Sequence, residues 1–497
     1  MAGLASLSDA EIALIKGMAQ VRPRLSYQAI LSYFTRPGRD INHRLIPLIV
    51  GGWLRSEVAT APPGAVIAFM SALTSVRYPV ATFFHNVGKA TAMASPFVAL
   101  LELNWWPVGQ GLFMSGRLES AQGGDFTWVY DCGSISEKTI RDKAIGQYNK
   151  TTARQIDLVT LSHFDEDHIN GIVELIRGRT IGTVLLPFIP LWQRLLIALG
   201  EGIPVNSALF EFFVDPVAYL ASVEGTEIGE IVFVPSAGPD DAAAPAPEEG
   251  DPDGPIEGAK IDYGKPPEDS AENLELTADR SVRAGHLRPG GRIAIPSLWE
   301  FVPYNDAQMQ PRVTPSFTRR ANIVASALIR TPKRRYKALK LLKKIYIRTF
   351  GKGSKPQNLI SLFLYSGPVG SRLKLAHDSA TSRVTWSAAR DNYAQLFTGD
   401  GYLHTPAQLQ ALQHFYAKDR RLARAGILQV MHHGASANWH NGVASTLAPA
   451  VSIFSSDPAR KPHHHPNADV LRDFWPWCPV QVDRSNGFHL LAVIEKS

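Results

Sequence analysis

Apolar residues at helical spacing mark the start of the chain. Ser8 stands three residues before Glu11, which is the spacing of a capping box: the serine accepts from a first-turn amide and the glutamate reaches back. The apolar positions that follow fall on one helix face: Ile12, Leu14, Ile15 and Met18. We therefore predict a helix that begins just after Ser8.

Two more short helices are expected within residues 1–55. Ser26 can cap a helix over 27–33, and Asp40 can cap a third that runs to Val50. Three short helices joined by Pro- and Gly-containing turns are typical of a helix-turn-helix. In that interpretation the third helix enters a DNA groove and basic residues contact phosphates, with these candidates: Arg36, Arg39, Asn42, His43 and Arg44. The alternative is a helical interaction or dimerisation module.

The pattern changes after a connector over residues 56–95. From Phe97 onward, short β-rich runs alternate with helical stretches, which predicts an α/β body over residues 96–497. The strands expected there are 97–103, 127–130, 156–161, 359–365, 393–397, 427–431, 451–454 and 488–494. A helical stretch over 172–176 is expected after the third of them.

Two insertions of opposite charge interrupt this body. Residues 236–272 are rich in Pro, Gly, Ala and acid, and we expect disorder because they offer too little apolar surface to offset the entropy of ordering. Residues 330–355 hold eleven Lys or Arg and no acid, with apolar positions at helical spacing, which predicts a basic helix. Its candidates for nucleic-acid contact are Lys340, Lys343, Lys344, Tyr336, Tyr346 and Phe350. The alternative is a solvated amphipathic helix packed on the core.

Composition and charge favour a polyanionic partner. The net charge of +6 includes seven acidic residues between Ser236 and Gly258, and the rest of the chain carries 51 Lys and Arg against 38 Asp and Glu. Two cysteines, Cys132 and Cys478, exclude a disulfide framework and favour a reducing, cytoplasmic location. The most apolar run, 181–191, is too short to cross a bilayer, so no membrane association is expected.

The strongest chemical signal follows the strand expected at 156–161. Four residues that can ligate a divalent cation stand within six positions: His163, Asp165, Asp167 and His168. A strand-to-helix turn can point such closely spaced side chains into one pocket. The alternative is a polar turn with a helix cap, which does not explain four ligand-type residues in one short stretch.

More candidate ligands follow later strands. Asp400 comes directly after Thr398 and Gly399 and can bridge two metals, while His432 and His433 follow the strand at 427–431. A histidine run ends in His465 after the strand at 451–454. A lone histidine is more often packed or solvated than a ligand. Because all of the candidates in this group follow predicted strands, we expect them to lie in one common site.

In the order and spacing of these candidate ligands, the chain resembles the metallo-β-lactamase superfamily, and within it the soluble hydrolase domain of the bacterial DNA-uptake competence channel. The resemblance runs from about residue 101 to the C-terminus, and its motifs lie at 107–111, 131–133, 163–168, 358–362, 397–400, 432–434 and 465–466. It implies an α/β fold of the αββα sandwich type, with the small all-helical unit added in front. It also implies two divalent cations.

The resemblance further implies how the ligands divide. One cation is expected on His163, Asp165 and a histidine of the 432/433 pair, with His433 favoured; the second is expected on Asp167, His168 and His465, with Asp400 shared. Most of the superfamily has His where this chain has Asp165, and the oxygen ligand shifts the preference from Zn²⁺ towards Mn²⁺ or Mg²⁺. Phe113 stands where the family has small polar residues and is expected to alter access to the site.

The expected activity is that of a metal-dependent phosphodiesterase, foremost a DNA nuclease with a two-metal-activated water. Its expected catalytic groups are Asp167, Asp400 and His432; Asp167 accepts a proton, and His432 or Ser436 binds a non-bridging oxygen. One alternative is a hydrolase for a lactone, ester or cyclic nucleotide, and another is a binding protein without activity. A role in defence against foreign DNA is a hypothesis from the architecture alone.

Overall fold

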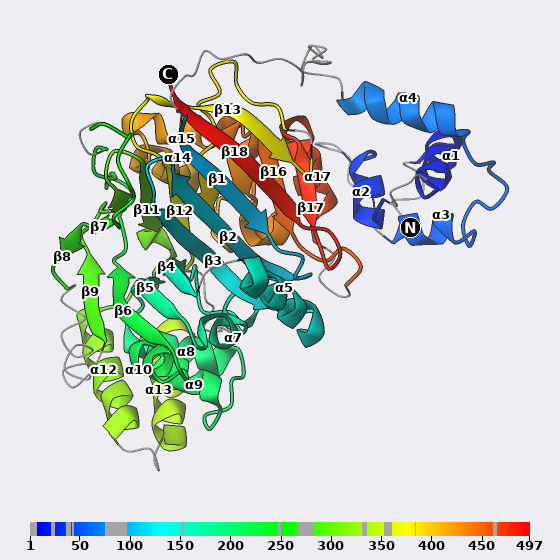
Figure 1. Ribbon diagram of the computed structural model, residues 1–497. Helices are drawn as coiled ribbons and strands as arrows, with labels where there is room; N and C mark the ends of the chain where they lie inside the picture. The colour runs from blue at the N-terminus through cyan, green and yellow to red at the C-terminus, as the bar shows by residue number, and fades with distance from the viewer. Residues whose placement is uncertain are drawn as a thin grey trace.

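Two β-sheets form the centre of the molecule (Figure 1). The computed structural model describes residues 7–20, 25–35, 41, 44–74, 97–151, 154–246, 250–266, 282–330, 335–351, 360–382, 384–460 and 465–497. The first sheet has ten strands in this order: β13 (Leu373–Ala380), β18 (Phe488–Lys496), β1 (Phe97–Trp105), β2 (Gly111–Ser120), β3 (Asp125–Ser134), β4 (Gln155–Thr160), β5 (Thr180–Pro187), β6 (Glu227–Val234), β9 (Arg283–Leu287) and β8 (Tyr263–Gly264). The second has eight: β17 (Pro479–Val482), β16 (Val451–Ser455), β15 (Ile427–Gln429), β14 (Gln395–Phe397), β12 (Leu362–Pro368), β11 (Trp299–Asn305), β10 (Ile293–Ile295) and β7 (Lys260–Ile261).

The inner faces of the two sheets pack against each other and form a buried core. Trp105 of β1 packs on Phe397 of β14 with ring centroids 5.9 Å apart, and Trp128 of β3 lies 6.2 Å from Trp299 of β11. Phe113 of β2 is fully buried beside Trp106 and Tyr148. Phe113 is therefore a core residue, and the expectation that it alters access to the site is wrong.

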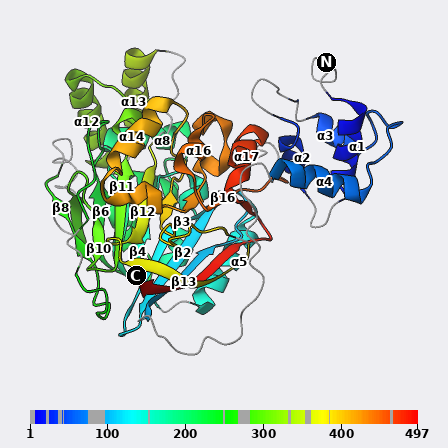
Figure 2. The same ribbon diagram turned by 90° about the horizontal axis from the view of Figure 1, so that it is seen from above.

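Helices cover the outer faces of both sheets (Figure 2). Those whose residues share the hydrophobic core of the first sheet are α5 (Lys138–Thr151), α7 (Ile172–Ile176), α8 (Leu191–Gly200), α9 (Ala208–Val214) and α10 (Pro216–Ala221), and α12 (Pro315–Arg330) and α13 (Arg335–Phe350) pack on α8. Those on the second are α14 (Pro406–Phe415), α15 (Arg421–Arg424), α16 (Val443–Leu447) and α17 (Ala468–Phe474). The order helix, sheet, sheet, helix is an αββα sandwich, and the predicted α/β fold class is confirmed.

The predicted strands correspond to observed ones because each carries an apolar run long enough to be buried. They are β1, β3, β4, β12, β14, β15, β16 and β18, and the helix predicted at 172–176 is α7. The strand β5 was not predicted, although all but two of its residues are buried. Its continuous apolar run results from parallel neighbours on both sides, β4 and β6, and from layers above and below.

Four helices make up the N-terminal part: α1 (Asp9–Met18), α2 (Tyr27–Ser32), α3 (Leu45–Val50) and α4 (Pro63–Thr74). The capping box is confirmed, since the Ser8 amide donates to the Glu11 carboxylate at 2.8 Å. Helix α4 falls within the expected connector, where no helix was predicted. Tyr33, next to α2, stacks on Trp475 after α17 with ring centroids 3.9 Å apart, which joins these helices to the sandwich.

The third helix differs from its prediction. It begins at Leu45 instead of just after Asp40, and it has no Lys or Arg between Leu45 and Val50. Of the predicted DNA-contacting residues, Arg44 precedes α3 as its N-cap. The others lie outside the described residues: Arg36, Arg39, Asn42 and His43.

The acidic insertion, expected to be disordered over 236–272, makes contacts with the body of the protein in its described parts, 236–246 and 250–266. Ala243 and Ile256 are buried, and their amides donate to backbone carbonyls of Phe415 and Gly123 at 2.9 and 3.0 Å. The Lys496 ammonium pairs with Asp251 at 2.6 Å. Composition alone predicted disorder because these partners are distant in sequence.

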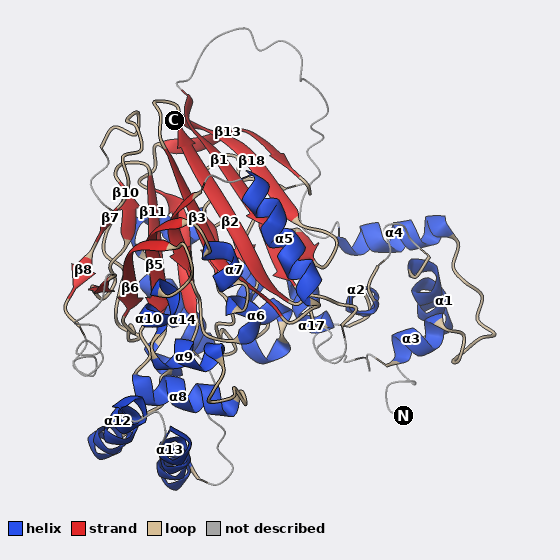
Figure 3. Cartoon of the chain, turned by 60° about the horizontal axis from the view of Figure 1, so that its bottom comes forward, coloured by secondary structure: helices blue, strands red, loops and turns tan. Residues whose placement is uncertain are grey.

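The basic insertion contains the predicted helix, α13, which forms a hairpin with α12 (Figure 3). Leu339 and Leu342 are buried in the hydrophobic core that α13 shares with α12 and α8. Tyr346 packs on Phe350, and Phe350 packs edge-on against Phe317 of α12, so both rings are partly buried within the hairpin. The remaining candidates are exposed: Tyr336, Lys340, Lys343 and Lys344. Among the residues described, no helix is long and apolar enough to span a bilayer.

Candidate metal centre

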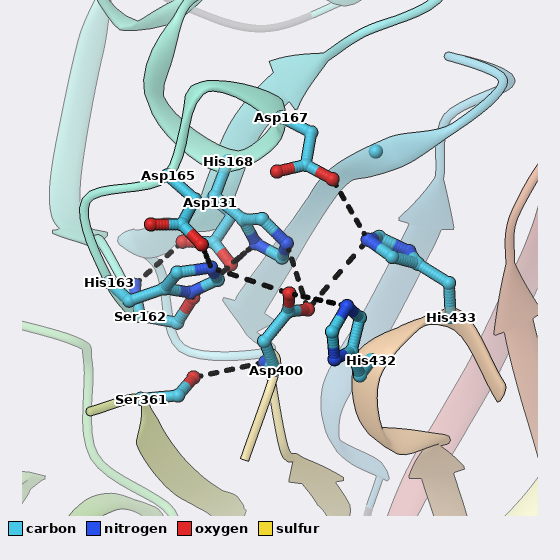
Figure 4. A network of polar contacts seen from close by, with 12 residues as sticks. Asp131, Ser162, His163, Asp165, Asp167, His168, Ser361, Asp400, His432 and His433 are labelled. Atoms are coloured by element: carbon cyan, nitrogen blue, oxygen red, sulfur yellow. Dashed lines mark hydrogen bonds and ion pairs between the residues drawn. The ribbon is translucent and has the colours of Figure 1, made fainter. Parts of the chain in front are cut away.

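The candidate ligands meet at the carboxyl ends of strands from both sheets (Figure 4). The chain after β4 turns into the short helix α6 (Glu166–Ile169) and carries the 163–168 motif. Asp400 follows β14, and His432 and His433 lie in the turn after β15. Strands β14 and β15 are parallel and adjacent, so their ends lie at the same edge of the sheet.

The carboxylate of Asp400 lies at the centre of four imidazoles. Its Oδ1 is 3.1 Å from Nε2 of His168 and 3.7 Å from Nε2 of His433. Its Oδ2 is 3.6 Å from Nε2 of His163 and 3.4 Å from Nε2 of His432. Each carboxylate oxygen thus faces two histidine nitrogens, as expected of a carboxylate that can bridge two cations.

Two more carboxylates complete the arrangement. Asp165 Oδ2 lies 3.6 Å from His163 Nε2, and Asp167 Oδ2 lies 3.2 Å from His433 Nε2. Among the described residues, three overlapping groups have ligand atoms close enough to hold a metal ion: His163, Asp167 and His168; His168, Asp400 and His433; and His163, Asp165 and Asp400.

All four histidines are held through the ring nitrogen that faces away from Asp400. Nδ1 of His168 lies 2.7 Å from the Asp131 carboxylate, and Nδ1 of His433 lies 2.5 Å from the Ser455 carbonyl. Both acceptors fix the proton on Nδ1, so that in the neutral ring Nε2 carries its lone pair into the site. Nδ1 of His163 contacts Ser162 Oγ at 2.8 Å, and Nδ1 of His432 contacts Asn438 Oδ1 at 2.8 Å.

Buried nitrogen and oxygen atoms of the site fit divalent cations as their partners. Nε2 of His163, Nε2 of His168 and Oδ1 of Asp400 are buried, and none meets hydrogen-bond geometry in the part of the chain that the structure describes, although His168 Nε2 and Asp400 Oδ1 lie 3.1 Å apart. Buried polar atoms without partners are costly and rare in folded proteins. Imidazole nitrogens and carboxylate oxygens are ligands of Zn²⁺ and Mn²⁺, so cations would satisfy these atoms.

Asp131 organises the turn that carries the ligands, and no role was predicted for it from the sequence. It is fully buried and adopts a positive φ of 56°. Its carboxylate accepts from the backbone amide and the hydroxyl of Ser162, both at 2.6 Å, and from His168. The signals in the sequence were its place in the motif at 131–133 and its position near the end of a buried strand.

Other supporting residues also went unpredicted. The Ser361 hydroxyl accepts from the Asp400 amide at 3.0 Å, and the Asn438 side-chain amide donates to the Asp400 carbonyl at 2.8 Å. Gly133 gives the 163–168 turn room, since a Cβ there would lie 2.5 Å from the amide nitrogen of His168. Gly133 and Ser361 lie in the motifs at 131–133 and 358–362, but their roles are recognisable only from the fold.

The charges in the site are strongly coupled. Burial alone would raise the pKa of Asp400, but the surrounding histidines, His432 foremost, hold it well below the usual range. Burial would lower the pKa of His168, but Asp400 and Asp131 raise it well above the usual value. The pKa of His433 is raised against burial by Asp400 and Asp167. Without a cation, protons on the imidazoles neutralise the carboxylates.

The structure brings together most of the predicted ligands but divides them differently from the expectation. His433 lies with Asp167 and His168, whereas the resemblance placed it with His163 and Asp165. His465 belongs to none of the three groups found among the described residues; its ring centroid lies 5.9 Å from that of His432. Ser436 is exposed, and its amide donates to Asn467 at 2.9 Å.

Comparison with known proteins adds little to this geometry. No protein-family model matches the chain, and no curated protein matches it. Among solved structures, the chain is similar to a long form of RNase Z from yeast, with 9% sequence identity and a TM-score of 0.29. The match covers 72% of this chain and 36% of that one, so it spans little more than a third of the RNase Z chain.

Proposed function

We propose that this protein is a metal-dependent phosphodiesterase that cleaves nucleic acid, with DNA as the favoured substrate. The observation that carries the proposal is the Asp400 carboxylate facing four imidazole Nε2 atoms. A hydrolase of this kind needs a preorganised set of cation ligands, and here each of the four histidine rings is held by a contact at its Nδ1 atom.

Two ligand sets share Asp400. His163 and Asp165 would hold one divalent cation, and Asp167, His168 and His433 would hold the other, with Zn²⁺, Mn²⁺ or Mg²⁺ as candidates. Bound divalent cations acidify water and neutralise the negative charge that develops on a phosphoryl group. His465 stays a candidate ligand of the second set because of its place in the family motif.

Among the four histidines around Asp400, His432 is the one most open to a substrate. Its side chain is 35% exposed, whereas those of His163 and His433 are buried. Asn438 fixes its Nδ1, which leaves Nε2 to bind or protonate a phosphoryl oxygen. Asp167 is the candidate proton acceptor; His433 and His168 hold its pKa below the usual range against burial, which keeps the carboxylate ionised but makes it a weak base. Ser436, exposed in the next turn, is a candidate for a second phosphoryl contact.

The charge of the surface supports a nucleic-acid substrate. Lys340, Lys343 and Lys344 are exposed on α13 and can neutralise phosphates. The resemblance to the competence-channel hydrolase favours DNA. Contact of the N-terminal helices with DNA, through Arg44 and the residues before it, is part of the same proposal, as is a role against foreign DNA.

The test is a cleavage assay with purified protein. Plasmid, single-stranded DNA and RNA are each incubated with Mn²⁺, Mg²⁺ or Zn²⁺, beside an Asp400→Ala variant. We expect cleavage that requires the cation and that falls at least about a thousandfold in the variant. Hydrolysis of a lactone or a simple phosphodiester, with no nucleic acid cleaved under any cation, would contradict the proposed substrate.

A further inference from the structure

Helix α17 has one face on the sandwich and another on the N-terminal helices. It lies between the second sheet and α2, as Figure 2 shows. Val470 and Phe474, four residues apart, are buried in the core between the second sheet and its helices. Ala468 is buried in the hydrophobic cluster of the N-terminal helices, and Trp475, directly after α17, stacks on Tyr33. One helix therefore contacts both parts of the chain.

The start of α17 holds the turn after β15, residues 431–438, which we call the histidine turn. Asn467, the N-cap of α17, makes two hydrogen bonds to it. The Asn467 backbone amide donates to the Gly434 carbonyl at 2.9 Å, and the Asn467 side-chain oxygen accepts from the Ser436 amide at 2.9 Å. Gly434 directly follows His433, so these bonds fix the backbone next to that candidate ligand.

The end of α17 holds the same turn from its other side. Oδ2 of Asp473 accepts from the Trp439 indole at 2.9 Å and from the Ala444 amide at 3.2 Å. Trp439 directly follows Asn438, and Oδ1 of Asn438 lies 2.8 Å from Nδ1 of His432. Both ends of α17 are thus bonded to the segment that carries the two histidines.

We propose that α17 positions the histidine turn, and that the N-terminal helices act on the metal centre through α17. Asn467 and Asp473 are positioning residues, because they contact the turn and none of the candidate ligand atoms. The turn needs this support, since His432 and His433 adopt positive φ values of 44° and 57°, which are costly for residues with a side chain. The inference rests on the proposed metal centre and not on the nature of the substrate.

The first test measures how tightly the full-length protein binds Co²⁺, by competition with a chromophoric chelator. The visible absorption of Co²⁺ also reports the arrangement of its ligands. Asn467→Ala should weaken binding about tenfold or more and change this spectrum, and Asp473→Ala should act in the same direction. Asn467→Asp keeps an acceptor oxygen and should restore most of the affinity. Asp469→Asn, an exposed change on the same helix, is the control and should bind like the wild type.

The second test concerns the N-terminal helices. Tyr33→Ala and Trp475→Ala, on the two sides of one ring contact, should each weaken Co²⁺ binding about fivefold or more. Because such coupling is reciprocal, Co²⁺ should slow amide hydrogen exchange in α2 of the wild type. A contact that only stabilises the fold would lower the melting temperature without this effect. Trp53→Ala is the matched control, since that side chain is 84% exposed.

The outcomes separate this inference from the proposed function. Equal Co²⁺ affinity in Asn467→Ala and the wild type, or exchange in α2 that Co²⁺ does not change, would overturn the inference. If nucleic acid is still cleaved in that case, the proposed function stands alone. The expected affinities without any cleavage of nucleic acid would support the inference and reject the nuclease. A wild-type chain that binds no Co²⁺ would overturn both the inference and the metal centre.

Discussion

The Nδ1 atom of His168 lies 2.7 Å from Oδ2 of Asp131, and both side chains are fully buried. Asp131 also accepts two hydrogen bonds from Ser162. This carboxylate therefore fixes the histidine ring so that Nε2 faces Asp400, and it keeps the 163–168 turn in place. Asp131 is a positioning residue of the site and not one of its ligands.

Replacing Asp131 with Asn should weaken cation binding about 10- to 100-fold, because the amide cannot accept all three hydrogen bonds. The affinity is measured by competition with a chromophoric chelator, beside thermal unfolding of the same sample. Asp142→Asn is the control, since Asp142 is an exposed carboxylate paired with Arg141 on α5. An Asp131→Asn protein that binds cations as tightly as the wild type would show that Asp131 does not position the cation ligands.

The pH dependence follows from the direction of the pKa shifts. The pKa values of His168 and His433 are raised on folding, mainly by Asp400 against the opposing effect of burial. Their protonated rings stabilise the metal-free protein below about pH 6.5, and this contribution is lost as the pH rises through their folded pKa values. The lowered pKa of Asp400 has the opposite consequence: its stabilisation is present above about pH 4 and is lost as the pH falls through its folded pKa.

Cation binding should release protons, because the ligands must be deprotonated. The gain in melting temperature on adding a divalent cation should thus increase between about pH 5.5 and pH 8.5. Calorimetry in buffers of different ionisation enthalpy measures the protons released directly. A thermal gain that shrinks as the pH rises would show that these imidazoles do not bind the cation.

The close approach at Gly133 should make it intolerant of a side chain. A Cβ there would lie 2.5 Å from the carbonyl carbon of Asp167 and 2.5 Å from the amide nitrogen of His168. Gly133→Ala should destabilise the fold by about 2 kcal/mol and impair cation binding at the same time. Gly146→Ala, on α5 with nothing within 4 Å, should instead be neutral or slightly stabilising. Urea unfolding of both variants tests the comparison, and equal effects would contradict it.

The basic helix should determine how strongly salt weakens nucleic-acid binding. Neutralising Lys340, Lys343 and Lys344 should lower the slope of log affinity against log salt by about two to three. The control neutralises three exposed lysines of α5, another helix on the same sheet: Lys138, Lys143 and Lys150. Fluorescence anisotropy over a salt series measures both slopes. An unchanged slope in the α13 variant would mean that this helix only packs on α12 and α8.

The sequence predicted the parts of the site that lie in short motifs. The turn from His163 to His168 places ligands one or two residues apart, and Asp400 and His433 each follow a recognisable strand. The short motifs did not show which ligands would group together around each cation. This grouping depends on how the turn after β15 bends, with positive φ at both His432 and His433, and this bend turns His433 towards Asp167.

The errors in the fold come from partners that are distant in sequence. The acidic insertion has little apolar surface of its own, but Ala243 and Ile256 are buried by the sheets, and their amides are bonded by residues that lie more than 100 positions away. In the basic helix, Phe350 meets Phe317 of a neighbouring helix that was not predicted. In both segments, local composition was outweighed by tertiary contact.

The metal content of the purified protein tests the central claim most directly. After loading with Mn²⁺ or Zn²⁺ and removal of free ions, elemental analysis should find about two ions per wild-type chain and well under one in Asp400→Ala. The variant should keep its secondary structure, because Asp400 lies at the end of β14 and outside the hydrophobic core. A wild-type chain that retains no divalent ion, or a variant that retains as many as the wild type, would contradict the account.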